Sequence, residues 1–162
     1  MQHLMTTVWS DWLERSKVVQ DIDPYAAYIY AYIALILFCR KIYNIPIGDE
    51  DIPIDLLIED YSEVYFVLTT FSKYKSSVRS ISEYFKFKPN LHYYYHRQNR
   101  EQPFRSGSFK THLYFLRNVR NNLVHGHKDF EARSEEIVNL ANKLIVNLFD
   151  EILTQLNEHE FV

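Results

Sequence analysis

The segment from Leu113 to Phe130 carries the side chains whose types and spacing could support a reaction. On a helix, where successive residues turn by about 100°, the polar residues Arg117, Arg120, Asn121 and His125 fall on one stripe. An apolar stripe on the other side is predicted to face the core: Phe115, Leu116, Val119 and Leu123. We therefore expect the polar side chains to face away from the core and to lie close together.

These polar side chains meet the minimum for cleaving RNA without a metal. An arginine guanidinium holds a phosphate, and a histidine exchanges a proton near neutral pH. A base removes the 2′-hydroxyl proton, that oxygen attacks the adjacent phosphorus, and an acid protonates the leaving 5′-oxygen. At the end of its helix His125 is expected to act as the acid, while Asn121 orients the imidazole or the phosphate. Because one chain offers a single Arg120 and His125, a symmetric dimer is expected to supply both acid and base.

The run Arg120-Asn121-Asn122-Leu123-Val124-His125 resembles the motif of the HEPN superfamily, in which an arginine and a polar residue precede a histidine by a few positions. HEPN proteins are small all-helical domains, and many are metal-independent ribonucleases of toxin–antitoxin, abortive-infection and related defence systems. The resemblance implies that Arg120 and His125 are the catalytic pair, with Asn121 as polar support. It also implies a site completed by dimerisation, a 2′,3′-cyclic phosphate product and a four-helix bundle with the motif at the end of its third principal helix.

One position departs from a branch of that superfamily. In the toxins silenced by a nucleotidyltransferase antitoxin, a tyrosine stands two residues after the motif histidine and is the group that is modified. This chain has His127 at that position. Control by AMP transfer is therefore in doubt here, while the nuclease motif itself is intact.

Residues 88–107 are predicted to form a long loop that leads into the motif helix, because they contain two Pro, one Gly and no regular period. Cations and aromatic rings are interleaved in and beside it, a pattern that binds the backbone and bases of single-stranded RNA. The alternative is that Tyr93, Tyr94 and Tyr95 pack on the bundle. With the motif helix included, the predicted RNA-binding residues are Arg97, Arg100, Arg105, Lys110, Arg117 and Lys128.

Charge is segregated along the chain in a way that the net charge of −3 hides. Residues 73–128 hold twelve Lys and Arg against Glu83 and Glu101, which gives +10 for this segment and −13 for the remainder. A local positive field can attract an anionic polymer even when the whole molecule is acidic. The acidic run 49–63 is predicted to be a solvated face or a docking surface for the basic segment of a second subunit.

Composition limits the class of protein. A chain of 162 residues, 47% hydrophobic with 3 Gly and 5 Pro, predicts one helical domain over 1–162. The lone Cys39 excludes an internal disulfide, so we expect a buried thiol and a reducing, cytoplasmic location. The uncharged stretch Tyr25 to Cys39 is shorter than the roughly 20 residues of a membrane span, and no secretory signal precedes it, so no membrane association is expected.

Two pairs of histidines have spacings from which a metal site could be drawn: His92 with His96, and His125 with His127. Neither pair belongs to a motif that supplies a carboxylate ligand as well. We therefore predict no metal and no other cofactor.

Helical periodicity predicts an all-α fold, a four-helix bundle of HEPN type with one or two accessory helices. Asp23 is the expected N-cap of a central core helix that begins at Pro24 and ends near Tyr43. The other expected helices are a short amphipathic segment over 8–19, a long helix over 54–68, a shorter one over 77–87, the motif helix after Ser108 through His125 with Gly126 as its stop, and a final helix over 137–156.

Taken together, these features predict a metal-independent endoribonuclease that acts on RNA as a homodimer with a composite site. The expected setting is the cytoplasm, in a toxin–antitoxin or defence role, with an antitoxin protein as a further partner. The alternative is a catalytically silent HEPN-like module whose polar stripe binds a nucleotide, RNA or a protein partner.

Overall fold

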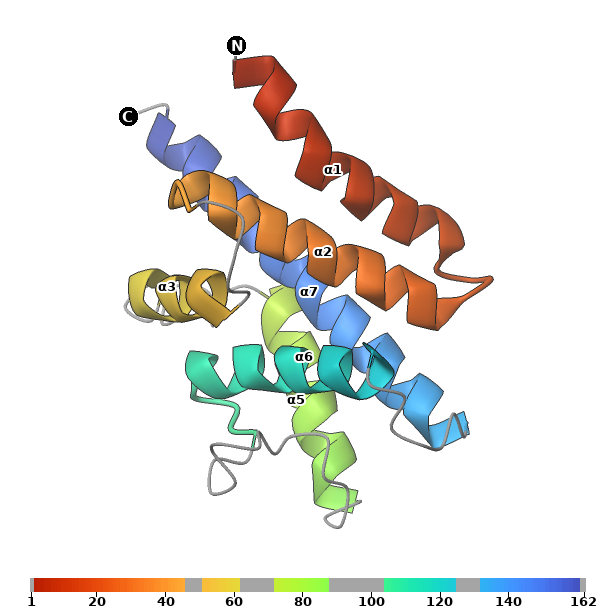
Figure 1. Ribbon diagram of the computed structural model, residues 1–162. Coiled ribbons are helices and arrows are strands. Elements are labelled where there is room, and N and C mark those ends of the chain that lie inside the picture. Colours follow the sequence, from red (N-terminus) through yellow and green to blue (C-terminus); the bar gives the residue numbers. More distant parts are fainter. Residues whose placement is uncertain (1, 46–50, 62–71, 88–103, 125–131, 161–162) are drawn as a thin grey trace.

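All regular secondary structure in the described part of the chain is helical. The computed structural model describes residues 2–45, 51–61, 72–87, 104–124 and 132–160. In these ranges there are six helices and no strand: α1 (Gln2–Val19), α2 (Pro24–Ile42), α3 (Asp51–Tyr61), α5 (Ser72–Phe87), α6 (Phe109–Val124) and α7 (Ala132–Glu160). Figure 1 shows α2 crossing α7, with α1 along one side of α2 and α6 on the other. The all-α prediction is confirmed for these residues, and the assignment to a HEPN-type bundle stays a prediction.

Helix α2 begins and ends where its sequence predicts. The carboxylate of Asp23 accepts a hydrogen bond from the amide of Ala26 at 3.1 Å, and proline opens the helix. At the other end Asn44 adopts a φ of 51°, the left-handed conformation that asparagine tolerates. The amides of Asn44 and Ile45 donate to the carbonyls of Lys41 and Arg40 at 3.3 Å and 2.9 Å. These two bonds form a Schellman motif, which fixes the end of α2.

The buried side chains of all six described helices form one hydrophobic cluster. Between α1, α2 and α7, the Trp9 ring stacks on Phe149 with centroids 5.6 Å apart and meets Phe38 edge-on at 5.2 Å. The hydroxyl of Ser16 in α1 donates to the carbonyl of Ala27 in α2 at 2.6 Å, so this polar group is satisfied inside the contact. The prediction that α2 is the core helix is confirmed, since Ala27, Ala31, Leu35 and Cys39 are fully buried.

Several helix bounds differ from the predicted ones. α1, α5 and α7 begin earlier than expected, at Gln2, Ser72 and Ala132. The predicted helix over 54–68 is confirmed as far as Tyr61, and its remainder lies outside the described residues. Ser108 directly precedes α6, and its backbone carbonyl accepts the first helical bonds, from the amides of Thr111 and His112. Hydrophobic periodicity detects the part of a helix that packs, which explains why the mostly polar first turns of α5 and α7 were missed.

Helix α2 is long and apolar enough to cross a membrane by length and composition alone. The uncharged stretch predicted to be too short is part of a 19-residue helix, so length does not exclude a span. Half of its most apolar window is buried against the rest of the protein. This burial is compatible with the core helix of a soluble protein.

Candidate functional site

Arg120 stands near the end of α6, where that helix packs on α2. Its side chain is half-buried, and its Cζ atom lies 5.2 Å from the centroid of the Tyr32 ring in a cation–π contact. Tyr32 itself is 3% exposed, so the ring cannot easily follow a moving guanidinium. The contact holds the charge of Arg120 at one place between the two helices.

A buried hydroxyl ties the same two helices together one helical turn before Arg120. The Tyr28 hydroxyl in α2 donates to the backbone carbonyl of Leu116 in α6. Leu116 lies four residues before Arg120, so its carbonyl also belongs to the helical turn that carries the Arg120 amide. Burial, with the neighbouring Tyr32 hydroxyl, raises the pKa of Tyr28 well above its usual value, while the charge of Arg120 acts in the opposite direction. The buried Tyr28 hydroxyl is thus satisfied by a backbone partner.

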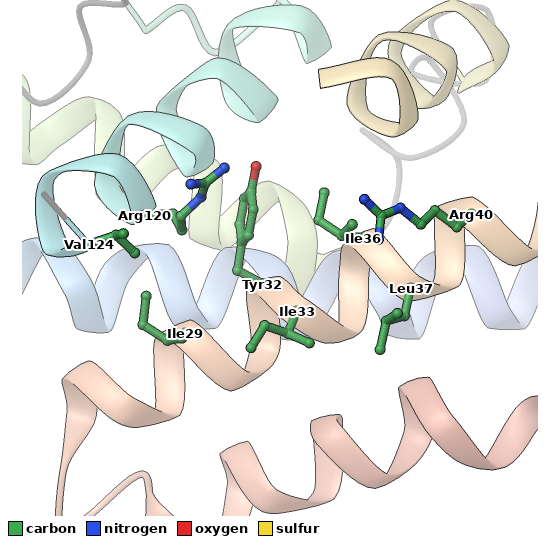
Figure 2. Close-up of a pocket in the computed structure, with 8 residues that line it drawn as sticks. All are labelled: Ile29, Tyr32, Ile33, Ile36, Leu37, Arg40, Arg120 and Val124. Carbon is green, nitrogen blue, oxygen red and sulfur yellow. The ribbon is translucent and has the colours of Figure 1, made fainter. Parts of the chain in front are cut away.

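A groove of 290 Å³ adjoins Arg120 and follows one side of α2 (Figure 2). Its lining comes from α2 and from the last turns of α6: Ile29, Tyr32, Ile33, Ile36, Leu37, Arg40, Arg120 and Val124. The partly exposed Ile29, Ile33 and Leu37 recur every four residues and form its apolar wall. Val124, which is 57% exposed, lies opposite Ile29. Most of the lining is therefore apolar, and its two charged residues are Arg40 and Arg120.

Arg40 is the site residue that the sequence alone did not single out. It comes from α2 and precedes Arg120 by eighty residues in the sequence, yet it lines the same groove. The Schellman motif at the end of α2 uses the Arg40 carbonyl and so fixes its backbone. One signal in the sequence could have identified Arg40. It is the first charged residue after the uncharged stretch Tyr25 to Cys39, and a charged side chain at that point must reach the protein surface.

The prediction that Arg117 faces away from the core is wrong. Its side chain is only 5% exposed, and its Cζ atom lies 4.9 Å from the centroid of the Tyr114 ring. The helical-wheel argument assumes one covered face, whereas α6 contacts α2, α3 and α7 and is covered on several sides. Arg117 therefore offers no open phosphate contact within the described chain. Asn121, like Arg120, is half-buried.

The apolar stripe of α6 is where it was predicted. Phe115, Leu116 and Val119 are at most 1% exposed, and Leu123 packs partly buried against the same core. The histidine of the motif, His125, lies outside the described residues, as do Gly126, His127, Lys128, Arg97, Arg100, the three tyrosines 93–95, and the pair His92 and His96.

Two of the predicted RNA-binding cations stand at the opposite end of α6 from Arg120. Arg105 and Lys110 are exposed, and the Nζ atom of Lys110 lies 5.5 Å from the centroid of the Tyr114 ring. Lys110 and Arg120 are ten residues apart, which corresponds to about 15 Å along the helix axis. Arg105 and Lys110 therefore lie just before and at the beginning of α6, and Arg120 lies near its end.

The segment just before α6 is held by a histidine that the sequence did not single out. His112 is fully buried; its Nε2 lies 2.8 Å from the carbonyl of Arg105, and its Nδ1 lies 2.7 Å from the Tyr74 hydroxyl. Because a carbonyl only accepts, Nε2 carries the proton and Nδ1 accepts from Tyr74. Burial lowers the pKa of His112 to about 4, against weaker opposing effects of the backbone hydrogen bonds at Arg105 and Ser106. His112 is therefore a neutral structural group.

Some of the aromatic rings beside the predicted loop pack on the helical bundle and are not free to stack on RNA bases. Phe104 stacks on the His112 ring with centroids 4.8 Å apart and meets Phe115 edge-on at 5.4 Å. Phe109 is 3% exposed, whereas Phe87 at the end of α5 is 80% exposed. Packing is thus the role of Phe104 and Phe109, and Phe87 is the described ring that remains accessible to a base.

The groups that could bind a metal or react as a thiol are sparse among the described residues. Among the described residues there is no group of three or more His, Cys, Asp or Glu side chains that could hold a metal ion. Cys39 is fully buried, which confirms the prediction of a buried thiol, and burial raises the pKa of this thiol to about 12. The acidic side chains Asp55, Glu59 and Asp60 are exposed, as predicted for a solvated face.

The described site can do two things chemically. The guanidinium of Arg120 can neutralise a phosphate that enters the groove, and the apolar wall can cover a nucleobase or a side chain of a partner. No protein family, curated protein or solved structure that was compared with the chain matches it. Function is therefore inferred from the site residues themselves.

Proposed function

We propose that the protein is a metal-independent endoribonuclease of HEPN type. The observation that carries the proposal is the position of Arg120, whose guanidinium is held against Tyr32 beside an open groove while Arg117, the preceding cation of α6, is buried. A guanidinium carries a permanent charge and a planar set of donors, so one that is held beside open space is suited to bind a phosphate. The proposed partner in chemistry is His125, five residues further along the chain.

In the proposed reaction the RNA phosphate lies against Arg120. The 2′-oxygen of the preceding ribose loses its proton to a base and attacks the phosphorus, and the bond to the 5′-oxygen breaks as an acid protonates that oxygen. His125 is assigned the acid role, and Asn121 positions the imidazole or a phosphate oxygen. Arg120 stabilises the additional negative charge of the five-coordinate phosphorus. The products carry a 2′,3′-cyclic phosphate and a free 5′-hydroxyl.

The proposed active form is a homodimer with a composite site. One chain supplies one Arg120 and one His125, whereas the reaction needs both an acid and a base. The apolar wall of Ile29, Ile33 and Leu37 beside Arg120 gives a second copy a surface on which to pack. A symmetric contact there brings the two arginines toward each other across the axis. We place this dimer in the cytoplasm, in a toxin–antitoxin or defence role, with an antitoxin protein as its partner.

The test is cleavage of RNA by purified protein in the presence of EDTA. Wild type, Arg120→Ala and His125→Ala are incubated with single-stranded and structured RNA, and the 3′ ends of the fragments are examined. We expect fragments whose 3′ ends resist phosphatase until the cyclic phosphate is opened, and a loss of at least about 100-fold in both variants.

Arg15→Ala is the matched control, because the Arg15 guanidinium also lies over an aromatic ring, 4.9 Å from the Trp12 centroid, but on α1. It is expected to cleave as the wild type does. Equal cleavage by all four proteins indicates a contaminating nuclease and refutes the proposal. Absence of cleavage by well-folded wild-type dimer refutes it as well.

One observation favours the alternative, a catalytically silent module that binds a partner. The groove beside Arg120 is mostly apolar, which suits a protein surface or a base better than an extended phosphate chain. In that case Arg120→Ala weakens self-association or ligand binding, and RNA in EDTA stays intact with every variant. Sedimentation of the wild type and Arg120→Ala, run beside the cleavage assay, separates the two functions.

A further inference from the structure

A second groove, of 530 Å³, lies between α5 and α7, and the proposed nuclease function makes no use of it. Seven residues line it: Lys73, Ser76, Ser77 and Ser80 from α5, and Leu140, Lys143 and Asn147 from α7. Two ammonium groups, three hydroxyls and one amide face the same space, and no carboxylate is among the lining residues. Such a lining suits an anion with several oxygen atoms.

The floor of this groove is organised before any ligand arrives. The Asn147 side-chain amide donates to the carbonyl of Lys73 at 3.1 Å and to the Ser77 hydroxyl at 2.6 Å. Asn147 therefore joins the two helices and fixes its own position. Since the Ser77 oxygen accepts this bond, its hydrogen remains able to donate. The Ser80 hydroxyl is used internally, donating to the carbonyl of Ser76 at 3.0 Å.

The charge pattern of α7 singles out Lys143. Residues 137–149 contain this lysine and no other charged side chain, although the helix as a whole is acidic. Glu136 and Asp150 lie outside this interval, on either side of it. Lys73 and Lys143 are exposed, and neither is ion-paired with a carboxylate in the described part of the chain. Lys143 is thus the only cation of α7 between residues 137 and 149, and it lines the same groove as Lys73 of α5.

The position of Lys73 within α5 adds to the local positive charge. Lys73 is the second residue of the helix, and the first turn holds no acidic side chain. A cation there is unfavourable, because the N-terminal end of a helix is itself partly positive. An anion bound by Lys73 and Lys143 would offset this unfavourable interaction and also the repulsion between the two ammonium groups.

We propose that the groove between α5 and α7 binds a phosphate group through the Lys73 and Lys143 ammonium groups and the Ser76 and Ser77 hydroxyls. The volume lies in the range of sites for small molecules the size of a nucleotide. The proposal is independent of the nuclease function, since none of these residues lines the Arg120 groove.

Calorimetric titration tests the proposal with three probes: inorganic phosphate, AMP and a short single-stranded RNA. The variant is Lys73→Gln with Lys143→Gln, and the matched control is Lys75→Gln, which removes an exposed cation of α5 that does not line the groove. We expect the double variant to bind phosphate at least about tenfold more weakly and the control to bind as the wild type does. Arg120→Ala is expected to leave phosphate binding unchanged.

The three probes identify the source of the phosphate. Tighter binding of AMP than of inorganic phosphate assigns a nucleotide, and tighter binding of RNA assigns the polymer; either result, if lost in the double variant, supports the site. An equal loss in Lys75→Gln shows a general effect of charge and overturns the proposal. Failure of the folded wild type to bind any of the three probes overturns it too.

Discussion

The two ends of α6 use polar side chains in opposite ways. Near the beginning of the helix, His112 is fully buried, and both of its ring nitrogens are engaged by Tyr74 and the Arg105 carbonyl. Near the end, Arg120 is half-buried and adjoins a groove of 290 Å³. The same helix thus carries a polar group that serves the fold and one that borders open space, where we propose that it meets a ligand. The difference between His112 and Arg120 is that only Arg120 borders a groove, and the residue type alone does not predict this.

Replacing His112 tests the structural end of this comparison and has the largest expected effect. His112→Leu removes the hydrogen bonds of a fully buried ring to the Tyr74 hydroxyl and the Arg105 carbonyl, together with its stacking on Phe104, so the free energy of unfolding should fall by about 4 kcal/mol in urea denaturation. His112→Gln keeps a donor and an acceptor and should lose about half as much. A loss under about 1 kcal/mol in His112→Leu contradicts a structural role.

The pH dependence of stability sharpens the same point. The pKa of His112 is lowered to about 4 in the fold, so between its unfolded value of 6.5 and about 4 the unfolded chain binds a proton that the folded chain does not. Stability from this group is complete above pH 6.5 and is lost as pH falls to about 4, by about 3 kcal/mol in total. Unfolding of wild type and His112→Gln across this range isolates the effect as the difference between the two curves. Parallel curves would remove His112 as the cause.

Arg120→Lys tests the functional end with a smaller expected effect. Lysine keeps the charge but loses the planar fork and its fit over the Tyr32 ring. We expect cleavage to fall about 100-fold, equivalent to about 2.7 kcal/mol in activation free energy, with the free energy of unfolding changed by under about 1 kcal/mol. Single-turnover cleavage and urea denaturation of the same preparation measure both. If Arg120→Lys loses much stability and cleaves RNA as the wild type does, then Arg120 is a structural residue and the comparison with His112 fails.

Local sequence signals predicted the parts of the fold that depend on local physics. Asp23 and Pro24 identified the start of α2 because capping involves only neighbouring residues. The apolar stripe through Phe115 and Val119 was correctly placed, since periodicity reports the face that packs. Cys39 was correctly interpreted as buried within an uncharged stretch.

Tertiary contacts explain what the sequence could not predict about the site. Arg117 is buried because α3 and α7 cover α6 in addition to α2, and a single-helix periodicity cannot count neighbours. Arg40 reaches the Arg120 groove only through the packing of α2 on α6, across eighty residues of sequence. His112 gave no signal, because its partners Tyr74 and Arg105 belong to segments whose proximity no local pattern encodes.

The bond from the Tyr28 hydroxyl to the Leu116 carbonyl has a consequence for hydrogen exchange. Loosening the turn that presents Arg120 requires breaking a bond to α2, whose Tyr28 is fully buried in the core. Fraying of this helix end is therefore coupled to the opening of the core helix. The Arg120 amide should exchange with solvent deuterium only in openings that also expose α2, so the site and the core belong to one cooperative unit.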